Sequence, residues 1–363
     1  MHSSPSPIPR PPFGGIYRQR KVLVTGHTGF KGSWLAYWLL KMGANVCGYA
    51  LPPPTNPNHF DLLKLDMESH IGDIRDIKRL LAVLALFRPE IVFHLAAQPL
   101  VRLSYKEPRE TFETNVMGTI NVLEACRQTP SVRAIVNITS DKCYKNKEWV
   151  WGYRENDPMG GFDPYSASKG CAELVASSYR NSFFNLADYG RGHSLLLASC
   201  RAGNVIGGGD WAQDRLIPDI MKAVSKGETV IIRSPNATRQ WQHVLEPLSG
   251  YLLVGQKLLE GKKEFAEAWN FGPGDNSSIS VEEVLKQIQK YWPNINYKID
   301  QDTNAPHEAN LLKLDCSKAH IKLGWKETWN SLEAFKNTTN WYRIYYEENF
   351  VVTEEQINQF VNL

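Results

Sequence analysis

The amino-acid sequence predicts an α/β protein with a doubly wound parallel sheet and a smaller mixed α/β region. Short apolar segments rich in β-branched residues alternate with amphipathic ones through the first 200 residues, which is the pattern of a parallel sheet covered on both faces. A glycine-rich loop joins the first apolar segment to the first amphipathic one. The alternation then weakens in 201–363, which indicates a second region with a cleft between the two.

Composition excludes several classes of protein. The chain has 363 residues, 42% hydrophobic and 22% charged, with a formal net charge of +3. This is a globular composition without the basic excess of a nucleic-acid-binding protein. The six cysteines form no C-x-x-C pair, so we expect reduced thiols in a cytoplasmic protein and no metal cluster. No apolar run approaches the length of about 18 residues that would span a membrane.

The predicted elements follow one another in order. Residues 1–20 contain scattered prolines and are expected to form a flexible tail rather than a signal peptide. Residues 21–200 then carry the predicted sheet, with strands at 21–25, 45–50, 91–95, 134–138 and 194–198 and helices at 33–42, 77–87, 111–127 and 166–182. Beyond residue 200, the clearest elements are a strand at 229–233 and a helix at 281–291.

The loop between the first strand and the first helix predicts a dinucleotide site. Gly26, Gly29 and Gly32 permit a tight turn and close approach of the backbone to a pyrophosphate, at the N-terminus of a helix. A purely structural turn is the alternative. No acidic residue lies between Gly32 and Asp61, so the loop alone does not distinguish NAD from NADP. Asp73 is a candidate for contact with the adenine from a neighbouring loop.

A tyrosine and a lysine predict the chemistry. Tyr165 and Lys169 lie one helical turn apart, and a nearby ammonium favours tyrosinate as a general base. A YxxxK pair also arises by chance. However, Ser140, Asp141 and Lys142 follow the predicted strand at 134–138, at the edge of the sheet where α/β proteins gather their active sites.

These motifs together resemble the extended short-chain dehydrogenase/reductase family. Within it, the chain is most similar to the nucleotide-sugar 4,6-dehydratases, and among these to the branch that acts on CDP-glucose. The resemblance covers nearly the whole chain from about Lys21. It is carried by the glycine loop, His94–Ala97, Thr114–Thr119, Thr139–Tyr144, Tyr165–Lys169, Arg201–Trp211 and Trp241–Val244.

The resemblance implies a Rossmann-type fold, bound NAD and a closed redox cycle. Tyr165, assisted by Ser140 and Lys169, would remove the proton of the sugar 4-OH while hydride leaves C4. Water would then be eliminated across C5 and C6, and the hydride would return to C6. Residues 21–200 would hold the cofactor and the catalytic groups, and 201–363 mainly the nucleotide sugar, with the chain interleaving between them.

The same resemblance assigns binding residues. Those implied for the substrate, CDP-glucose, are Gln98, Asn204, Arg239 and His307. The residues implied to contact the cofactor, besides Tyr165 and Lys169, are Gly26, Thr28, Gly29, Phe30, Gly32, Asp73, Ile74, Leu95, Ala96, Ala97 and Asn115.

One position departs from the better-known dTDP-glucose dehydratases. They carry Asp-Glu where this chain has Asp141-Lys142, with the Asp protonating the departing hydroxyl and the Glu removing the C5 proton. Lys142 would have to be neutral to act as that base, which requires burial or nearby cations to lower its pKa. The alternative is that Lys142 is only a charge partner of Asp141, and we favour the base.

Partners and alternatives complete the expectations. The helices at 111–127 and 166–182 resemble those that pair subunits in this family, so a homodimer or a dimer of dimers is expected, in deoxysugar synthesis for a surface O-antigen. His94 is expected to be a packed core histidine, while His27 is either a cofactor contact or a loop filler. The competing functions are another nucleotide-sugar 4,6-dehydratase, a 4-epimerase, or a catalytically silent NAD-binding module.

Overall fold

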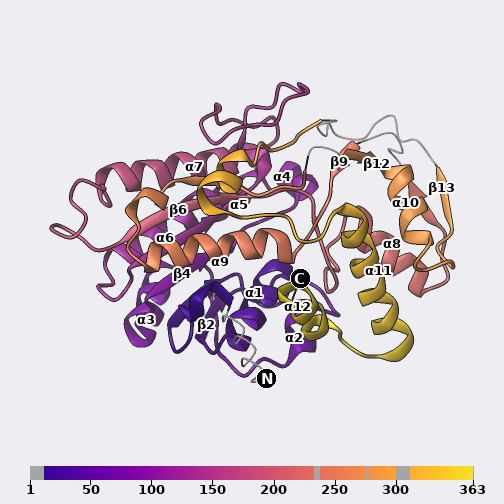
Figure 1. The fold of residues 1–363 in the computed structure, drawn as a ribbon, viewed down its shortest axis with the longest axis horizontal. Coiled ribbons are helices and arrows are strands. Elements are labelled where there is room, and N and C mark those ends of the chain that lie inside the picture. The colour runs from indigo at the N-terminus through magenta and orange to yellow at the C-terminus, as the bar shows by residue number, and fades with distance from the viewer. Residues whose placement is uncertain (1–11, 233–237, 275–277, 300–310, 363) are drawn as a thin grey trace, which may run out of the picture.

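The computed structural model describes residues 12–232, 238–274, 278–299 and 311–362. Its centre is a seven-stranded sheet in the order β11-β6-β5-β4-β1-β2-β3, with every neighbouring pair parallel (Figure 1). The predicted fold class is therefore confirmed. The strands are β1 (Lys21–Thr25), β2 (Asn45–Ala50), β3 (Glu68–Ile71), β4 (Ile91–His94), β5 (Ala134–Ile138), β6 (Leu196–Arg201) and β11 (Ala268–Asn270).

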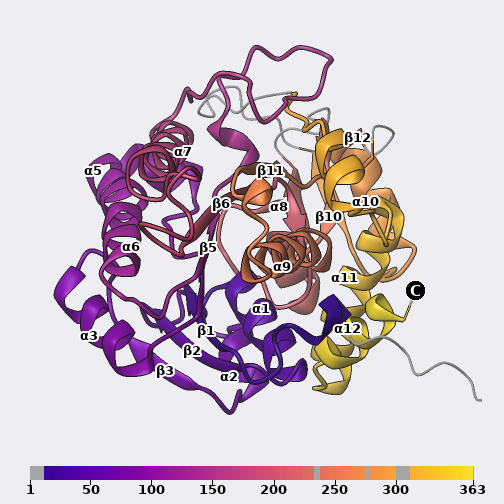
Figure 2. The same cartoon turned by 60° about the vertical axis from the view of Figure 1, so that its left-hand side comes forward.

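Helices cover both faces of the sheet, which explains why its central strands are apolar throughout (Figure 2). Val22 and Val24 of β1 pack with α1 and α9 on one face, whereas Leu23 packs with α3 and α6 on the other. The helices flanking the sheet are α1 (Phe30–Lys41), α3 (Ile77–Phe87), α6 (Gly118–Arg127), α7 (Pro164–Ser182) and α9 (Leu245–Leu259). Shorter helical elements lie between these helices in the chain: α2 (His59–Leu63), α4 (Val101–Lys106), α5 (Pro108–Phe112), the π-helical turn η2 (Glu113–Met117) and the turn η3 (Asp141–Cys143).

The chain after residue 200 forms the second region and also returns to the sheet. β11 adds an edge strand and α9 packs against β5 and β6, so both belong to the sheet although they follow residue 200. The remaining strands pair two by two: β7 (Val205–Ile206) with β10 (Gln242–His243), β8 (Val230–Ile232) with β13 (Tyr297–Ile299), and β9 (Thr238–Gln240) with β12 (Ser278–Ser280). The helical elements are α8 (Leu216–Ser225), η4 (Lys263–Phe265), α10 (Val281–Gln289), η6 (Ala319–Leu323), α11 (Ser331–Glu348) and α12 (Thr353–Val361).

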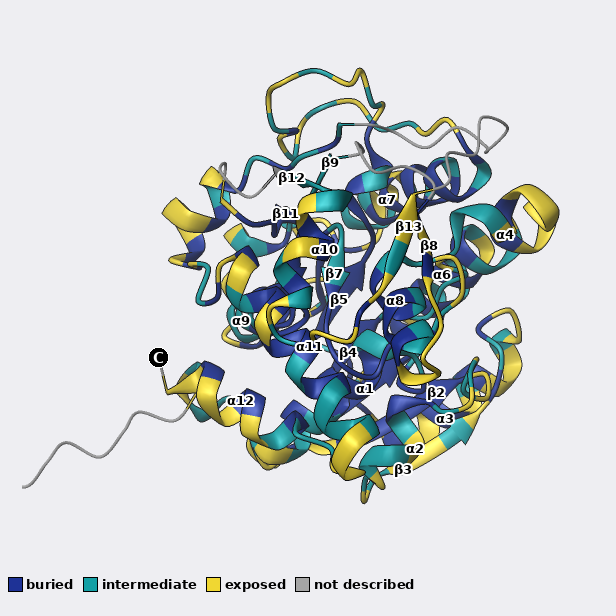
Figure 3. Ribbon diagram, turned by 90° about the vertical axis from the view of Figure 1, so that its right-hand side faces the viewer, coloured by how far each residue is buried: buried dark blue, intermediate teal, exposed yellow. Residues whose placement is uncertain are grey.

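Burial falls where the layers meet. The central strands β1, β4, β5 and β6 and the inner faces of α1 and α9 are largely buried, while the edge strand β3 and the outer turns of the surrounding helices are exposed (Figure 3). The tryptophans of the C-terminal region belong to this core: Trp329 and Trp341 are both almost fully buried. No helix within the described ranges is long and apolar enough to cross a membrane.

The structure corrects the predicted N-terminal tail. Pro12–Gly15 forms the short helix η1, and the buried Tyr17 donates a hydrogen bond of 2.5 Å to the carbonyl of Leu252 in α9. The prediction of a flexible tail is thus wrong for residues 12–20, because an aromatic side chain anchors them to α9. Residues 1–11 lie outside the described ranges.

Two element boundaries also differ from the prediction. α1 begins at Phe30 rather than at residue 33, because Gly29 takes the N-cap position directly after the loop. β6 spans Leu196–Arg201 rather than 194–198. This shift brings Arg201 into the sheet, a placement that becomes important below.

Candidate active site

The glycine loop has the geometry that a dinucleotide requires. Gly26 has a φ of +77°, and a Cβ there would lie 2.7 Å from the backbone nitrogen of Ala96. A Cβ on Gly32 would lie 2.0 Å from the carbonyl oxygen of Gly26. Gly29 caps α1 without a side chain, so the first amide N–H groups of this helix face the loop without a side-chain acceptor. Such a cradle fits the diphosphate of NAD.

The loops after β3 and β4 complete the predicted cofactor site. Ile74 packs against Gly118, where a Cβ would lie 2.4 Å from Ile74 Cδ1. Leu95 donates its backbone N–H to the carbonyl of Thr25 at 3.1 Å, so the 95–97 segment lies beside the glycine loop. Thr28 is buried and donates its hydroxyl to the carbonyl of Leu51 at 2.9 Å.

Asp73 is ionised at the end of β3. Burial opposes this ionisation, but hydrogen bonds from the side chain and backbone of Arg75 outweigh it and hold the pKa of Asp73 below its ordinary value. The Arg75 Nη2–Asp73 Oδ2 distance is 2.6 Å. The predicted adenine-contacting carboxylate thus has an arginine beside it.

The structure brings the predicted catalytic residues together. α7 packs directly on η3, so Tyr165 lies against the turn that carries Ser140 and Asp141. Ser140 donates its hydroxyl to Asp141 Oδ1 at 2.9 Å. All three side chains are buried. This arrangement can exchange protons with a substrate hydroxyl beside the cofactor loop.

Burial shifts the pKa values of Tyr165 and Lys169 in opposite directions. Burial raises the pKa of Tyr165 to about 12, while Ser140 and the cation of Arg215 pull it down. The assistance of Lys169, expected from the sequence to favour tyrosinate, stays a prediction. Burial lowers the pKa of Lys169 to about 8, against the carboxylate of Glu173, which raises it.

Lys142 is half-buried in the same turn. Its backbone N–H donates to Ser140 Oγ at 3.2 Å. The salt bridges of the described residues include none between its ammonium and Asp141, and its role as the C5 base or as the charge partner of Asp141 stays a prediction.

Asn115 and Gln98 are engaged with each other. Asn115 lies in the π-helical turn η2, where it accepts from the backbone N–H of Gln98 at 2.8 Å and donates to Ser168 Oγ at 2.9 Å. The Gln98 side chain donates to Thr111 Oγ1 at 2.9 Å. The predicted cofactor and substrate roles of these two residues stay predictions, because both side chains have partners within the protein.

The predicted substrate residues fall into three situations. Asn204, with a φ of +47°, lines a small cavity of about 10 Å³ together with Asp141 and Gln240. Arg239 lies in β9, next to Gln240. His307 lies outside the described residues.

Sequence reasoning missed two cations of this site. Arg215 forms an ion pair with Asp210 at 2.8 Å and acts on Tyr165. Burial, followed by the charges of Arg215 and Lys169, lowers the pKa of Lys31 to about 8. Lys31 lies in the first turn of α1, between Phe30 and Gly32 of the glycine motif, and this position in the motif was the available signal. Arg215 has no comparable signal in the sequence, because only the fold brings it to Tyr165.

The histidines take mainly structural positions. His94 is buried, with one ring nitrogen 2.7 Å from Thr25 Oγ1 and the other 3.2 Å from Thr119 Oγ1. The prediction of a packed core histidine is confirmed. His27 is also buried, and its Nε2 lies 2.7 Å from Ser69 Oγ.

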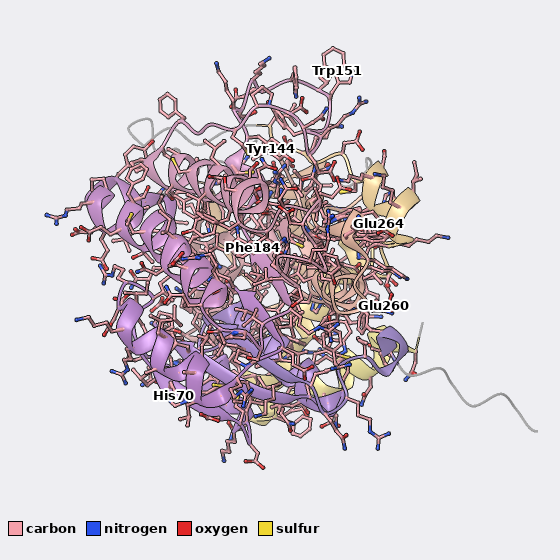
Figure 4. The ribbon with its side chains drawn as sticks, turned by 90° about the vertical axis from the view of Figure 1, so that its left-hand side faces the viewer. His70, Tyr144, Trp151, Phe184, Glu260 and Glu264 are labelled. Carbon is pink, nitrogen blue, oxygen red and sulfur yellow. The ribbon has the colours of Figure 1, made fainter. Side chains whose placement is uncertain are left out.

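The fold also assembles a group that sequence spacing did not reveal. Ligand atoms of Cys47, Glu68 and His70 lie within 4.8 Å of one another on β2 and β3, at the edge where Figure 4 labels His70. Burial, followed by the charge of Glu68, raises the pKa of the Cys47 thiol to about 12, which opposes the thiolate that a metal needs. His70 already pairs with Glu68 at 2.6 Å.

Comparison with known proteins agrees with this geometry. A family model described as GDP-mannose 4,6 dehydratase matches residues 23–338. A CDP-glucose 4,6-dehydratase of Salmonella typhimurium is 54% identical over 96% of this chain and 98% of its own length.

Solved structures share the fold at lower identity. An epimerase from Methanothermobacter thermautotrophicus is 24% identical, with a TM-score of 0.77 over 93% of this chain and 96% of its own. A UDP-glucose 4-epimerase from Thermus thermophilus, solved as a complex with NAD, is 24% identical, with a TM-score of 0.75 over 89% and 99% of the two chains. From its family match, its close relative and its fold, this chain belongs to the GDP-mannose 4,6 dehydratase family of extended short-chain dehydrogenases/reductases.

Proposed function

We propose that the chain is an NAD-dependent CDP-glucose 4,6-dehydratase, a hydro-lyase that forms CDP-4-dehydro-6-deoxy-D-glucose. The observation that carries this proposal is the 54% identity to the Salmonella typhimurium enzyme of that name over nearly the full length of both chains. Ser140, Asp141, Tyr165 and Lys169 are all present and buried around one site, as an active member of the family requires.

The glycine loop would hold the cofactor. Gly26, Gly29 and Gly32 would bind its diphosphate, and Asp73 and Ile74 would contact its adenine. Bound NAD would supply the acceptor for the C4 hydride and the hydride donor for C6. The predicted contacts of Phe30, Thr28, Asn115 and the segment Leu95, Ala96 and Ala97 belong to this part of the proposal.

The chain's own residues move the protons. Tyr165, assisted by Ser140 and Lys169, takes the proton of the 4-OH, and the resulting ketone acidifies the C5 hydrogen. Lys142, as a neutral amine, removes this C5 proton, and Asp141 gives a proton to the departing 6-OH. Asn204, Arg239, Gln98 and His307 bind the nucleotide diphosphate and sugar.

We also propose a setting for the reaction. The six cysteines, all of them described, form no disulfide, in keeping with a reducing cytoplasm. Exposed apolar side chains on the helices predicted to pair subunits, Met117 (50% exposed) and Leu174 (59%), favour a homodimer or a dimer of dimers. The product would enter the synthesis of deoxysugars for O-antigen.

A product assay tests the function. Purified protein is incubated with CDP-, dTDP-, UDP- or GDP-glucose, with and without added NAD, and products are identified by mass spectrometry and by NMR. Loss of one water from CDP-glucose alone is the expected result. Loss of water from another nucleotide sugar indicates a different dehydratase, a product of unchanged mass indicates a 4-epimerase, and no product with any of the four indicates a silent NAD-binding protein.

A further inference from the structure

We propose that Glu173, through its ion pair with Arg201, is a positioning residue of the active site: it clamps the segment Thr139–Tyr144 to α7 and places a negative charge one helical turn from Lys169. The inference deepens the proposed function and rests on it. It concerns two residues, Glu173 and Arg201, that are not among the predicted cofactor, substrate or catalytic residues.

The clamp begins at two fully buried charges. Glu173 Oε2 lies 2.8 Å from Arg201 Nη2, and each side chain is 4% exposed. The other carboxylate oxygen, Oε1, accepts a hydrogen bond from the hydroxyl of Thr139. Thr139 directly precedes Ser140, so one carboxylate joins α7 and β6 to the end of β5.

Arg201 extends the clamp to Tyr144, at the other end of the segment Thr139–Tyr144. Its Nη1 donates to the Tyr144 hydroxyl at 2.6 Å, and its guanidinium lies 5.0 Å from the centre of the Tyr144 ring. Tyr144 in turn donates to Asn270 Oδ1 of β11 at 2.7 Å. Figure 4 shows Tyr144 inside the body of the protein, below the exposed loop that carries Trp151.

The two ends of the clamp enclose the catalytic groups. Ser140, Asp141 and Lys142 lie between Thr139 and Tyr144, and Tyr165 and Lys169 lie on the helix that carries Glu173. A buried ion pair of this kind costs desolvation energy and adds little net stability. The ion pair therefore acts here by fixing the distance between the segment Thr139–Tyr144 and α7.

The charge of Glu173 has its own consequence. Tyr165, Lys169 and Glu173 follow at intervals of four residues on α7, and all three are buried. The groups that act on Lys169 from other elements are Lys31 of α1, His94 of β4 and Cys143 of η3.

Among these groups, Glu173 provides the stable negative charge. Burial lowers the pKa of His94 to about 3 and raises that of the Cys143 thiol well above its ordinary value, so both are neutral near pH 7. Lys31 is cationic or neutral and cannot favour a second ammonium. Burial opposes ionisation of Glu173, but the charge and hydrogen bond of Arg201 and the hydroxyl of Thr139 keep its pKa low. Glu173 is thus the group that favours the charged form of Lys169.

The test compares variants that separate charge from shape. Glu173→Gln keeps the size and the acceptor of the side chain but removes the charge. Because the protonated Lys169 is lost as pH rises through its pKa, the alkaline limb of the kcat profile should move down by about one pH unit. Turnover of CDP-glucose at pH 8 should fall about fivefold, with less change near pH 6.5 and a KM within about twofold of the original.

Three further variants divide the proposal into its parts. Glu173→Asp keeps the charge and should retain the alkaline limb at a lower kcat. Thr139→Val removes one hydrogen bond and should lower kcat without moving the limb. Glu267→Gln is the matched control, because it breaks an ion pair with Lys318 of 2.6 Å and is not among the groups that act on Lys169; it should leave the profile unchanged.

Two further measurements distinguish a failure of the proposal from a failure of folding or of the proposed function. If Glu173→Gln leaves Arg201 too poorly compensated to fold, the double variant Glu173→Gln/Arg201→Gln removes both charges and should show the same shift. NMR titration of ¹³C-labelled lysine, assigned with Lys169→Gln, measures the Lys169 ammonium without turnover. If the wild type makes no product, the proposed function fails while this titration still decides the role of Glu173. An unshifted titration and kcat profile in the charge-free variants would overturn the inference.

Discussion

Tyr165 must lose a proton from a buried position. Burial raises the pKa of its phenol to about 12, which disfavours the unprotonated form near neutral pH. Ser140 and Arg215 already act in the required direction. Burial and these two groups therefore act on the phenol in opposite directions.

Removal of this hydroxyl is the simplest test at the residue scale. Tyr165→Phe keeps the buried ring and loses the group that accepts the proton of the 4-OH, so kcat should fall by about 10²–10⁴-fold. Turnover is measured with CDP-glucose, and NAD affinity by fluorescence quenching serves as the control, with little change expected. A variant that turns over at the wild-type rate would show that another group removes this proton.

Lys142 allows a test that separates two steps. Lys142→Met should slow the uptake of solvent deuterium at C5 more than it slows the oxidation at C4, because only the first step needs the base. Single-turnover absorbance of the reduced cofactor follows C4, and NMR follows C5. Lys145→Met, an exposed lysine three residues later, is the matched control. Equal slowing of both steps would remove Lys142 from the role of base.

The glycine loop and the helix that follows it form one unit at the element scale. The sequence predicts a helix from residue 33, whereas α1 begins at Phe30. The difference arises because Gly32, a poor helix former, is placed within the first turn, where only hydrogen fits against the carbonyl of Gly26. The requirement of the loop therefore overrides the helix propensity.

Other elements escaped prediction for different reasons. β3 and β11 have four and three residues, and short strands carry too little periodicity to be recognised. The helix predicted at 111–127 is interrupted by the π-helical turn η2, because Asn115 is drawn toward Gln98 and Ser168. These tertiary contacts have no local signal in the sequence.

The helices predicted to pair subunits give a test at the same scale. Leu174 of α7 is 59% exposed, and Leu174→Glu should dissociate the oligomer by placing charge in an apolar interface. Light scattering after size-exclusion chromatography measures the mass. Ile321→Glu is the control, since this residue is 82% exposed on η6 and should leave the mass unchanged. An unaltered mass for Leu174→Glu would exclude α7 from the interface.

Across the whole molecule, α9 links the sheet to the C-terminal helices. Glu246 in its first turn is buried and accepts the backbone N–H of Trp329 at 2.7 Å, just before α11. Burial raises the pKa of this carboxyl to about 8, although its hydrogen bonds pull it down. Folding therefore favours the protonated form of the Glu246 carboxyl.

This buried carboxyl predicts a pH-dependent stability. A pKa raised on folding contributes stability at low pH, and the contribution is lost as pH rises from the ordinary value toward about 8. The melting temperature of the wild type should fall more between about pH 5 and about pH 8 than that of Glu246→Gln. Glu264→Gln, at an exposed position labelled in Figure 4, should follow the wild type. Parallel curves for the wild type and Glu246→Gln would contradict the raised pKa.

The sequence predicted the local features of the site better than its assembly. The glycine loop, the YxxxK pair and the Ser140–Lys142 turn each have a signature within a few residues, and the structure brings them to one place. Arg215 and the Glu173–Arg201 pair have none, because they meet the site only through the order of strands and the register of β6. Their roles follow from contacts between distant parts of the chain.

The central claim is a redox cycle that begins and ends within one turnover. It is tested most directly with CDP-glucose carrying deuterium at C4, with the product examined by NMR and mass spectrometry. If the hydride taken from C4 returns to C6, the 4-keto-6-deoxy product retains the deuterium at C6. A product with only protium at C6, or a 4-epimer that retains deuterium at C4, would contradict the account.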